Sequence, residues 1–136
     1  MTEDIKSALK RYNQWVGTYK KSGELKLIQV WLTLSNGAIE FLTGGDSYKV
    51  KRLKRDSRVV CYIGAKTGPE VKGTAEIVTD QTAIRRVYRA YWKTHPFMML
   101  ILAPAISRKI KSGTQVLIRV RPDDPDIFFG ITDPVV

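Results

Sequence analysis

The stretch 43–58, TGGDSYKVKRLKRDSR, holds the side chains best suited to chemistry, and that chemistry is the capture of an anion. Its basic residues are Lys49, Lys51, Arg52, Lys54, Arg55 and Arg58. Two acids, Asp46 and Asp56, accompany them. Asp46 and Ser47 are suited to cap a helix that begins just before Lys49. Because the free N–H groups and the dipole at a helix start attract anions, the segment predicts a phosphate-binding turn. A solvated basic helix is the alternative.

No grouping of side chains typical of nucleophilic, acid–base or metal catalysis stands out. The chain has one cysteine, Cys61, and one histidine, His95, which leaves no basis for a Cys/His zinc site or an internal disulfide. Cys61 lies in the apolar run 59–63 and is predicted to be a small buried hydrophobe. His95 precedes Pro96 and is predicted to end a helix rather than to catalyse a reaction. We therefore expect no catalytic side chain and no metal site.

Length and charge define the class of protein. A chain of 136 residues with 43% hydrophobic content predicts one domain, 1–136, with a substantial core. The formal net charge of +10 should attract phosphate esters, nucleic acids or acidic lipid head groups. The N-terminal MTEDIKSALK lacks the apolar centre of a signal peptide, and the longest apolar run, 97–106, is too short to span a bilayer. We expect a soluble, cytoplasmic protein with no membrane insertion.

Apolar residues at helical spacing predict two amphipathic helices, 3–17 and 81–94, with an extended segment at 16–19 as the alternative for the end of the first. Asp80 is a good N-cap for the second, whose basic residues are predicted to face solvent, with a nucleic-acid surface as the alternative. Pro96 is expected to end this helix, and 97–106 to form a second short helical segment packed on the sheet.

The remaining chain is predicted to be rich in strands. The segment 25–34 is apolar on both faces and is expected to be covered on both sides, as in a barrel or a dimer interface. Asn36-Gly37 predicts a hairpin to a strand at 38–43. Further strands are predicted at 58–64, 71–79, 114–121 and 126–131. Gly73 predicts a bulge or the close approach of a ligand or backbone. The pattern indicates a mainly β (α+β) protein built as a small barrel.

This order of elements, with its phosphate-ready turn, resembles the pyridoxamine 5'-phosphate oxidase-like split barrels, which include flavin- and deazaflavin-dependent oxidoreductases. The resemblance covers 16–79 and is carried by VGTYKKSGELKLIQVWLTLSNG, AIEFLTGGDSYKVKRLKRDSRVV and EVKGTAEIVTD. Its most specific part is Thr43 followed by the run 47–53. The resemblance implies a six-stranded antiparallel split β-barrel with two to three flanking helices. It also implies a homodimer with the cofactor site at the interface.

The resemblance further implies a set of cofactor-binding residues. These are Gln29, Val30, Trp31, Thr43, Ser47, Tyr48, Lys49, Lys51 and Arg52. The first three would lie along the ring system of the cofactor. Thr43 and Ser47 would hydrogen-bond its phosphate, and Lys49 and Lys51 would supply charge to it. Gln29 stands where several family members have Arg, which is a departure from a typical FMN oxidase.

The function that the resemblance implies is an oxidoreductase. It would transfer a hydride between a bound flavin-type cofactor, F420 or FMN, and a small organic substrate. In such proteins the cofactor carries the hydride chemistry and the protein positions it. The short chain, the Val-Trp pair at 30–31 and the run 49–53 favour the deazaflavin branch. One alternative is a non-catalytic protein of the same fold that holds a flavin, F420 or haem. The other is a basic nucleic-acid-binding protein, which the separation of aromatic from basic residues disfavours.

Overall fold

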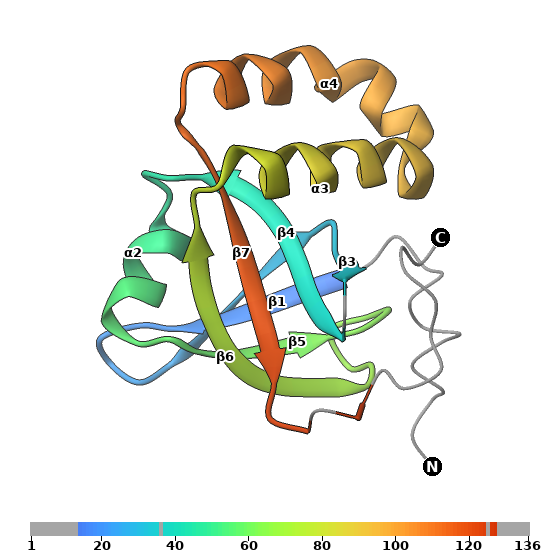
Figure 1. Cartoon of the computed structure of the whole chain (residues 1–136). Coiled ribbons are helices and arrows are strands. Elements are labelled where there is room, and N and C mark those ends of the chain that lie inside the picture. The colour runs from blue at the N-terminus through green and yellow to red at the C-terminus, as the bar shows by residue number, and fades with distance from the viewer. Residues whose placement is uncertain (1–13, 36, 125, 128–136) are drawn as a thin grey trace.

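Seven strands form one antiparallel sheet, and three helices flank it, in the residues that the computed structural model describes, 14–35, 37–124 and 126–127 (Figure 1). The strands are β1 (Gln14–Tyr19), β2 (Leu25–Val30), β3 (Thr33–Ser35), β4 (Ala38–Gly44), β5 (Arg58–Tyr62), β6 (Glu70–Val78) and β7 (Gln115–Pro122). The helices are α2 (Tyr48–Arg55), α3 (Gln81–Thr94) and α4 (Pro96–Lys111). The protein is therefore mainly β with helices, as predicted, with seven strands where six were expected.

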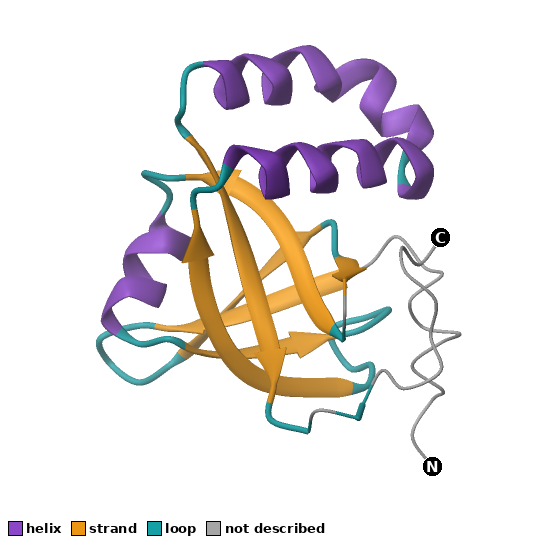
Figure 2. Cartoon of the chain, in the orientation of Figure 1, coloured by secondary structure: helices purple, strands orange, loops and turns teal. Residues whose placement is uncertain are grey.

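The sheet is curled because its two edge strands are neighbours in the sequence. The strand order is β2-β1-β5-β6-β7-β4-β3, so β2 and β3 lie at opposite edges. Only Trp31 and Leu32 join them, and so short a link spans only about 10 Å. The two edges must therefore approach each other, which bends the sheet around a core (Figure 2).

This arrangement corrects the prediction of one strand at 25–34. The chain leaves one sheet edge at Trp31 and joins the other at Thr33, so the segment forms two strands. The side chains of β2 are half-buried or exposed in the single chain, so the barrel does not cover both of its faces, and covering by a second subunit stays a prediction. Strand β2 pairs with β1 alone within the described residues, and an edge strand keeps one side open.

The predicted helix 3–17 is wrong over residues 14–17, which belong to β1, and its part 3–13 lies outside the described residues. Strand β1 is paired on both sides, to β2 and to β5, so sheet hydrogen bonds outweigh the helical spacing of its apolar residues. Gly17 fits this position because Leu25 and Leu27 fold over it. A Cβ there would lie 2.8 Å from Leu25 and 2.9 Å from Leu27.

Most of the other predicted elements are confirmed. The hairpin joins β3 to β4, and Gly37 adopts a φ of 78° in its turn. Gly73 marks a close approach of two backbones, because a Cβ at this position would lie 2.5 Å from the carbonyl oxygen of Arg121. The last predicted strand is wrong at Asp126 and Ile127, which form a turn, and 128–131 lie outside the described residues.

Helix α4 is longer than the predicted segment 97–106, and it packs mainly on α3 and less on β7. Pro96 begins this helix, because proline suits the first helical turn. Pro104 lies within it. None of the described helices is long and apolar enough to cross a membrane.

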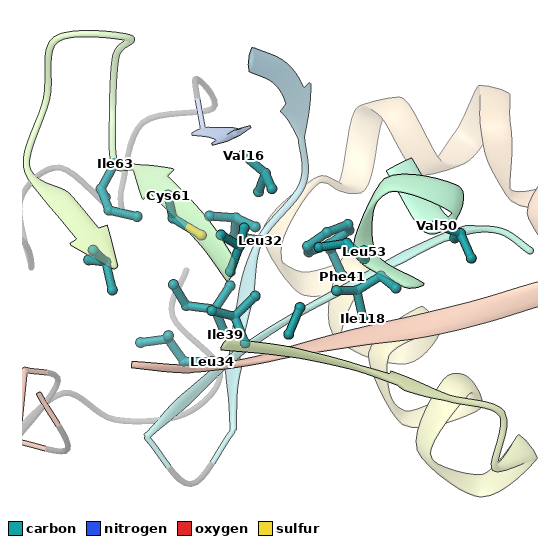
Figure 3. Close-up of a cluster of buried hydrophobic side chains, with 14 of the residues drawn as sticks. Val16, Leu32, Leu34, Ile39, Phe41, Val50, Leu53, Cys61, Ile63 and Ile118 are labelled. Carbon is teal, nitrogen blue, oxygen red and sulfur yellow. The ribbon is translucent and has the colours of Figure 1, made fainter. Parts of the chain in front are cut away.

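Two apolar clusters fill the interior. One lies inside the curled sheet and includes Val16, Phe41 and Ile118 (Figure 3). It also contains Cys61, as predicted, and burial raises the pKa of this thiol to about 12. The second cluster lies beneath α3 and α4 and centres on residues such as Ile84. The two helices are thus fixed to the sheet by their own core.

A buried carboxylate adds a polar connection between α3 and the sheet. Glu40 of β4 is fully buried. It accepts hydrogen bonds from Nη1 and Nη2 of Arg86 on α3, at 2.8 and 3.2 Å, and from Nε of Arg119 on β7, at 2.8 Å. Such charge-assisted pairs are sensitive to geometry, so they hold α3 in one position across β4.

Candidate functional site

A pocket of about 750 Å³ lies where the ends of β2 and β4 meet helix α4. Its volume is in the range typical of small-molecule and cofactor sites. Strands β2 and β4 contribute 29–30 and 42–44, and the link after β2 contributes Trp31. Helix α2 contributes Lys49, and the start of β7 contributes Gln115. The pocket therefore forms beside the Trp31–Leu32 link, where the two edges of the sheet come together.

One end of the pocket is cationic. Lys49 from the first turn of α2 and Lys109 from the last turn of α4 both line it. Partial burial lowers the pKa of Lys49, and the charges of Arg52 and Lys109 lower it further. Nη1 of Arg52 is buried and has no hydrogen-bond partner in the described part of the chain. Because these cations repel one another, an anion bound among them would be stabilised.

The turn before α2 is built as the sequence predicted. Ser47 is the N-cap, and its Oγ accepts a hydrogen bond of 3.3 Å from the backbone N–H of Val50. The hydroxyl of Thr43 donates to Ser47 Oγ over 3.4 Å. Thr43 and Gly44 line the pocket, so the start of α2 lies beside its cationic end.

The other end of the pocket is aromatic. The rings of Trp31 and His95 stack with centroids 4.5 Å apart, and Tyr91 meets the Trp31 ring edge-on at 5.3 Å. Burial lowers the pKa of His95 to about 4, so its imidazole is neutral at neutral pH. The Tyr91 hydroxyl accepts from the N–H of Leu42 (2.8 Å) and donates to the carbonyl oxygen of Trp31 (3.1 Å). Burial raises the pKa of that hydroxyl, which keeps it protonated as a donor.

The structure brings five of the nine predicted cofactor-binding residues together. Those that line the pocket are Gln29, Val30, Trp31, Thr43 and Lys49. Those that do not are Ser47, Tyr48, Lys51 and Arg52.

The four residues outside the pocket have other surroundings. Ser47 caps α2, and Arg52 is close enough to Lys49 for its charge to lower the pKa of that amine. Tyr48 is 73% exposed, with Nζ of Lys51 5.3 Å and Cζ of Arg52 5.9 Å from the centre of its ring. The basic run therefore points only partly into the pocket.

Helix α4 supplies a wall that sequence reasoning missed. Met98, Leu102, Ala105 and Lys109 all line the pocket. Their spacing of four, three and four residues places them on one helical stripe, a signal that the sequence carried. Phe97 and Lys109 lie about 18 Å apart along the helix axis, at about 1.5 Å per residue. The pocket is thus elongated along α4.

Two further pocket residues, His95 and Gln115, were not predicted as site residues. His95 is a helix-end residue, as expected, because it lies between α3 and α4, but it also lines the pocket. Gln115 is buried, and its Oε1 has no hydrogen-bond partner within the described residues. Its amide can accept from a ligand N–H or, when flipped, donate to a ligand oxygen.

The described residues contain no group of His, Cys, Asp and Glu side chains that could hold a metal ion. No acidic side chain lines the pocket in the part of the chain that the structure describes. The arrangement can hold an elongated ligand with an anionic group at one end and a flat ring at the other. The side chains of the pocket are suited to binding and orienting such a ligand more than to transferring protons.

The sequence matches no protein-family model and no curated protein. Solved structures of similar fold include a conserved hypothetical protein of Mycobacterium tuberculosis, with a TM-score of 0.69 and 22% identity over 90% of this chain and 81% of that one. An F420 reductase aligns with a TM-score of 0.58 and 18% identity over 90% of this chain and 95% of that one. A Listeria innocua protein assigned as a pyridoxamine 5'-phosphate oxidase aligns with a TM-score of 0.62 and 14% identity over 88% and 89%.

At identities this low the similarity shows the fold alone. The chain has the split-barrel fold, as the resemblance in its sequence implied.

Proposed function

We propose that the pocket binds a flavin-type cofactor, F420 or FMN, and that the protein is an oxidoreductase acting on a small organic substrate. The observation that carries the proposal is the polarity of the pocket, cationic at Lys49 and Lys109 and aromatic at Trp31. A flavin or deazaflavin has the matching polarity, with a phosphate-bearing chain attached to a flat ring system. The reductase and oxidase names among the structural neighbours agree with this assignment.

The residues present fit such a group. Lys49, Lys109 and the N-terminal turn of α2 would hold the phosphate, because ammonium groups and free backbone N–H groups both favour an anion. The buried amide of Gln115 would regain a partner from the ligand. Val30 and Trp31 would lie along the ring, and Gln29 would meet a polar edge of it.

When bound, the cofactor would supply the hydride chemistry. The contribution of this chain would be to position the ring and to limit access of water with the apolar side chains of α4. His95, neutral at neutral pH, would add no positive charge at the ring end. No catalytic side chain is assigned.

The proposal is tested by fluorescence titration of the purified, cofactor-free protein with FMN and, separately, with F420. Replacing Lys49 by Ala should weaken binding about 10- to 150-fold, because a charge-assisted hydrogen bond contributes roughly 1.5–3 kcal/mol. Lys54→Ala, which removes an exposed charge from the same helix and lies outside the pocket, is the control and should change the Kd less than about twofold.

Three outcomes of the titration distinguish a correct proposal from a wrong one. Tight binding of one cofactor, weakened by Lys49→Ala alone, supports the proposal and identifies the cofactor. Equal effects of the two Lys variants would show that the phosphate is placed wrongly. Binding of neither cofactor would remove the oxidoreductase proposal, and haem or nucleic acid would then be titrated.

We also propose that the protein is a homodimer with the cofactor site at its interface. Strand β2 supports this, because it is an edge strand carrying half-buried Leu25 and Leu27 on the outer face of the sheet, and its end at 29–30 lines the pocket. An open strand edge can pair with another chain, and natural proteins protect such edges. Sedimentation velocity should give twice the mass of the chain, and a monomer at all concentrations would contradict the proposal.

A further inference from the structure

We propose that Gln115 binds the chain that joins the ring of the ligand to its anionic group, and that it selects ligands whose chain carries hydroxyl groups. The inference rests on the proposed cofactor function and names a recognition step within it. It begins from a buried side chain at the pocket. Gln115 is 5% exposed and lines the pocket, and its Oε1 makes no hydrogen bond to any described residue.

A second buried glutamine shows how a structural amide is bonded in this protein. Gln14 of β1 is 3% exposed, and its Oε1 accepts a hydrogen bond of 2.8 Å from the backbone N–H of Gly64. It does not line the pocket. A buried acceptor without a partner destabilises a protein, whereas a paired one does not. The amide of Gln115 therefore destabilises the ligand-free pocket, and a ligand that supplies a donor removes that cost.

The register of the sheet places Gln115 next to the aromatic end of the pocket. Gln115 is opposite Gly44 of β4, and Leu117, two residues further along β7, is opposite Leu42. The N–H of Leu42 is the group that donates to the hydroxyl of Tyr91 at that end. Residues two apart on a strand lie about 7 Å from each other and face the same side of the sheet. Gln115 is therefore one such step away from the aromatic end.

The cationic end begins on the other side of Gln115. The preceding residue, Thr114, donates its backbone N–H to the carbonyl oxygen of Lys109 over 3.1 Å. Its carbonyl oxygen accepts from the N–H of Gly45 over 2.7 Å, in the turn that leads into α2. These two bonds connect the start of β7 to the elements that carry Lys109 and Lys49. A group bound by Gln115 would therefore lie between the ring and the anion of the ligand.

The chemistry of an amide favours a hydroxyl at this point. Glutamine presents one acceptor oxygen and two N–H donors, and turning the amide over exchanges them. A hydroxyl both donates and accepts, so it pairs with the amide in either orientation. A hydrocarbon chain pairs with it in neither. FMN and F420 both carry several hydroxyl groups between ring and phosphate, so the inference applies to either cofactor.

Binding of the phosphate itself is the alternative role for Gln115. An ionised phosphate accepts hydrogen bonds, so it would engage the amide N–H groups and leave the amide oxygen without a donor. Lys49, Lys109 and the start of α2 already suit the anion. A hydroxyl of the chain gives the oxygen its donor, and the observations therefore favour the chain over the phosphate.

The test compares FMN with an analogue that keeps the ring and the phosphate but joins them by an unsubstituted hydrocarbon chain. If F420 alone binds the wild type, the corresponding two deazaflavins are used. The ratio of the two Kd values measures the preference for the hydroxylated chain. Gln115→Leu should reduce this ratio about 3- to 10-fold, the range of one neutral hydrogen bond, and should change the Kd of the analogue less than about twofold.

Gln14→Leu is the matched control, because it makes the same replacement at the other buried glutamine. It should leave the Kd ratio unchanged. Thermal unfolding of the ligand-free proteins adds a readout that needs no cofactor. Gln115→Leu should raise the Tm by about 2–5 °C, because it removes an unpaired buried amide. Gln14→Leu should lower the Tm, because it leaves the N–H of Gly64 without its partner.

Three results would overturn the inference. The first is a Kd ratio that Gln115→Leu leaves unchanged, because the amide would then not contact the chain of the ligand. The second is a Tm that Gln115→Leu lowers as much as Gln14→Leu does, because the amide would then have a structural role. Both results leave the proposed cofactor function standing. The third, binding of neither FMN nor F420 to the wild type, removes that function and the inference together.

Discussion

Replacing Tyr91 by Phe removes one oxygen atom from the point where the two edges of the sheet approach each other. Strand β3 ends its pairing with β4 opposite Glu40, so β3 supplies no partner for the N–H of Leu42. The Tyr91 hydroxyl accepts from that N–H over 2.8 Å and donates to the carbonyl oxygen of Trp31 over 3.1 Å. One hydroxyl on α3 thus connects β4 to the link between β2 and β3.

The expected loss of stability follows from the two groups left behind. A buried N–H without a partner costs about 1–3 kcal/mol. The carbonyl of Trp31 lies beside the pocket and can accept from water, so we assign little cost to it. The ring contact between Trp31 and residue 91 remains in the variant. We expect a loss of about 2 kcal/mol, which lowers the Tm by roughly 6–10 °C in a domain of this size.

Thermal and urea unfolding measure the stability that Tyr91→Phe loses. The matched control is Tyr88→Phe. Tyr88 is half-buried on the same helix, and its hydroxyl makes no hydrogen bond among the described residues, so its replacement should change stability by less than about 0.5 kcal/mol. Hydrogen exchange adds a local measure, because the Leu42 amide should exchange faster in Tyr91→Phe. Equal stability of the two variants, with unchanged exchange at Leu42, would refute the reasoning.

Two further predictions concern buried polar groups. Glu40→Gln should destabilise the protein by about 2 kcal/mol in urea unfolding, because it removes the charge that pairs Arg86 with Arg119, whereas Glu76→Gln at a half-exposed ion pair should cost less than about 1 kcal/mol. A similar cost for both would show that the buried position of Glu40 contributes nothing. The folded-state pKa of His95, about 4, lies below its ordinary value of 6.5, so the unfolded chain takes up this proton first. The associated stability is complete above pH 6.5 and is lost as the pH falls to 4. The slope of Tm against pH in that window should be shallower in His95→Gln, and an unchanged slope would contradict the assignment.

Much of the fold could be predicted because its signals are local. Ser47 and Asp80 cap helices at the expected positions, since an N-cap acts within three residues. The pairing of β3 with β4 and the alternating strand β7 were predicted from equally local patterns. The helix predicted over residues 14–17 was wrong because pairing of β1 with two strands outweighed a helical spacing of apolar residues.

The candidate site was predicted on its strand side and missed on its helix side. The segment 29–31, Thr43 and Lys49, which the resemblance singled out, line the pocket, and their contact with a cofactor stays a prediction. Lys109, Gln115 and His95 join them from α4, from β7 and from the junction of the two helices. In the sequence Lys109 belongs to a helical stripe that fits a solvated helix face equally well, and His95 and Gln115 belong to no motif.

The sequence by itself determined most of the helices and strands from residue 38 to residue 122, the N-cap that begins α2 and the excess of positive charge. These properties depend on neighbours along the chain or on composition. Only the tertiary structure decided that β2 and β3 lie at opposite edges of the sheet, and that Lys109 lies beside Lys49. It also decided which face of α4 stays exposed. Such contacts join residues far apart in sequence, and they form only where burial of the common core outweighs the conformational entropy lost on closing the long loops.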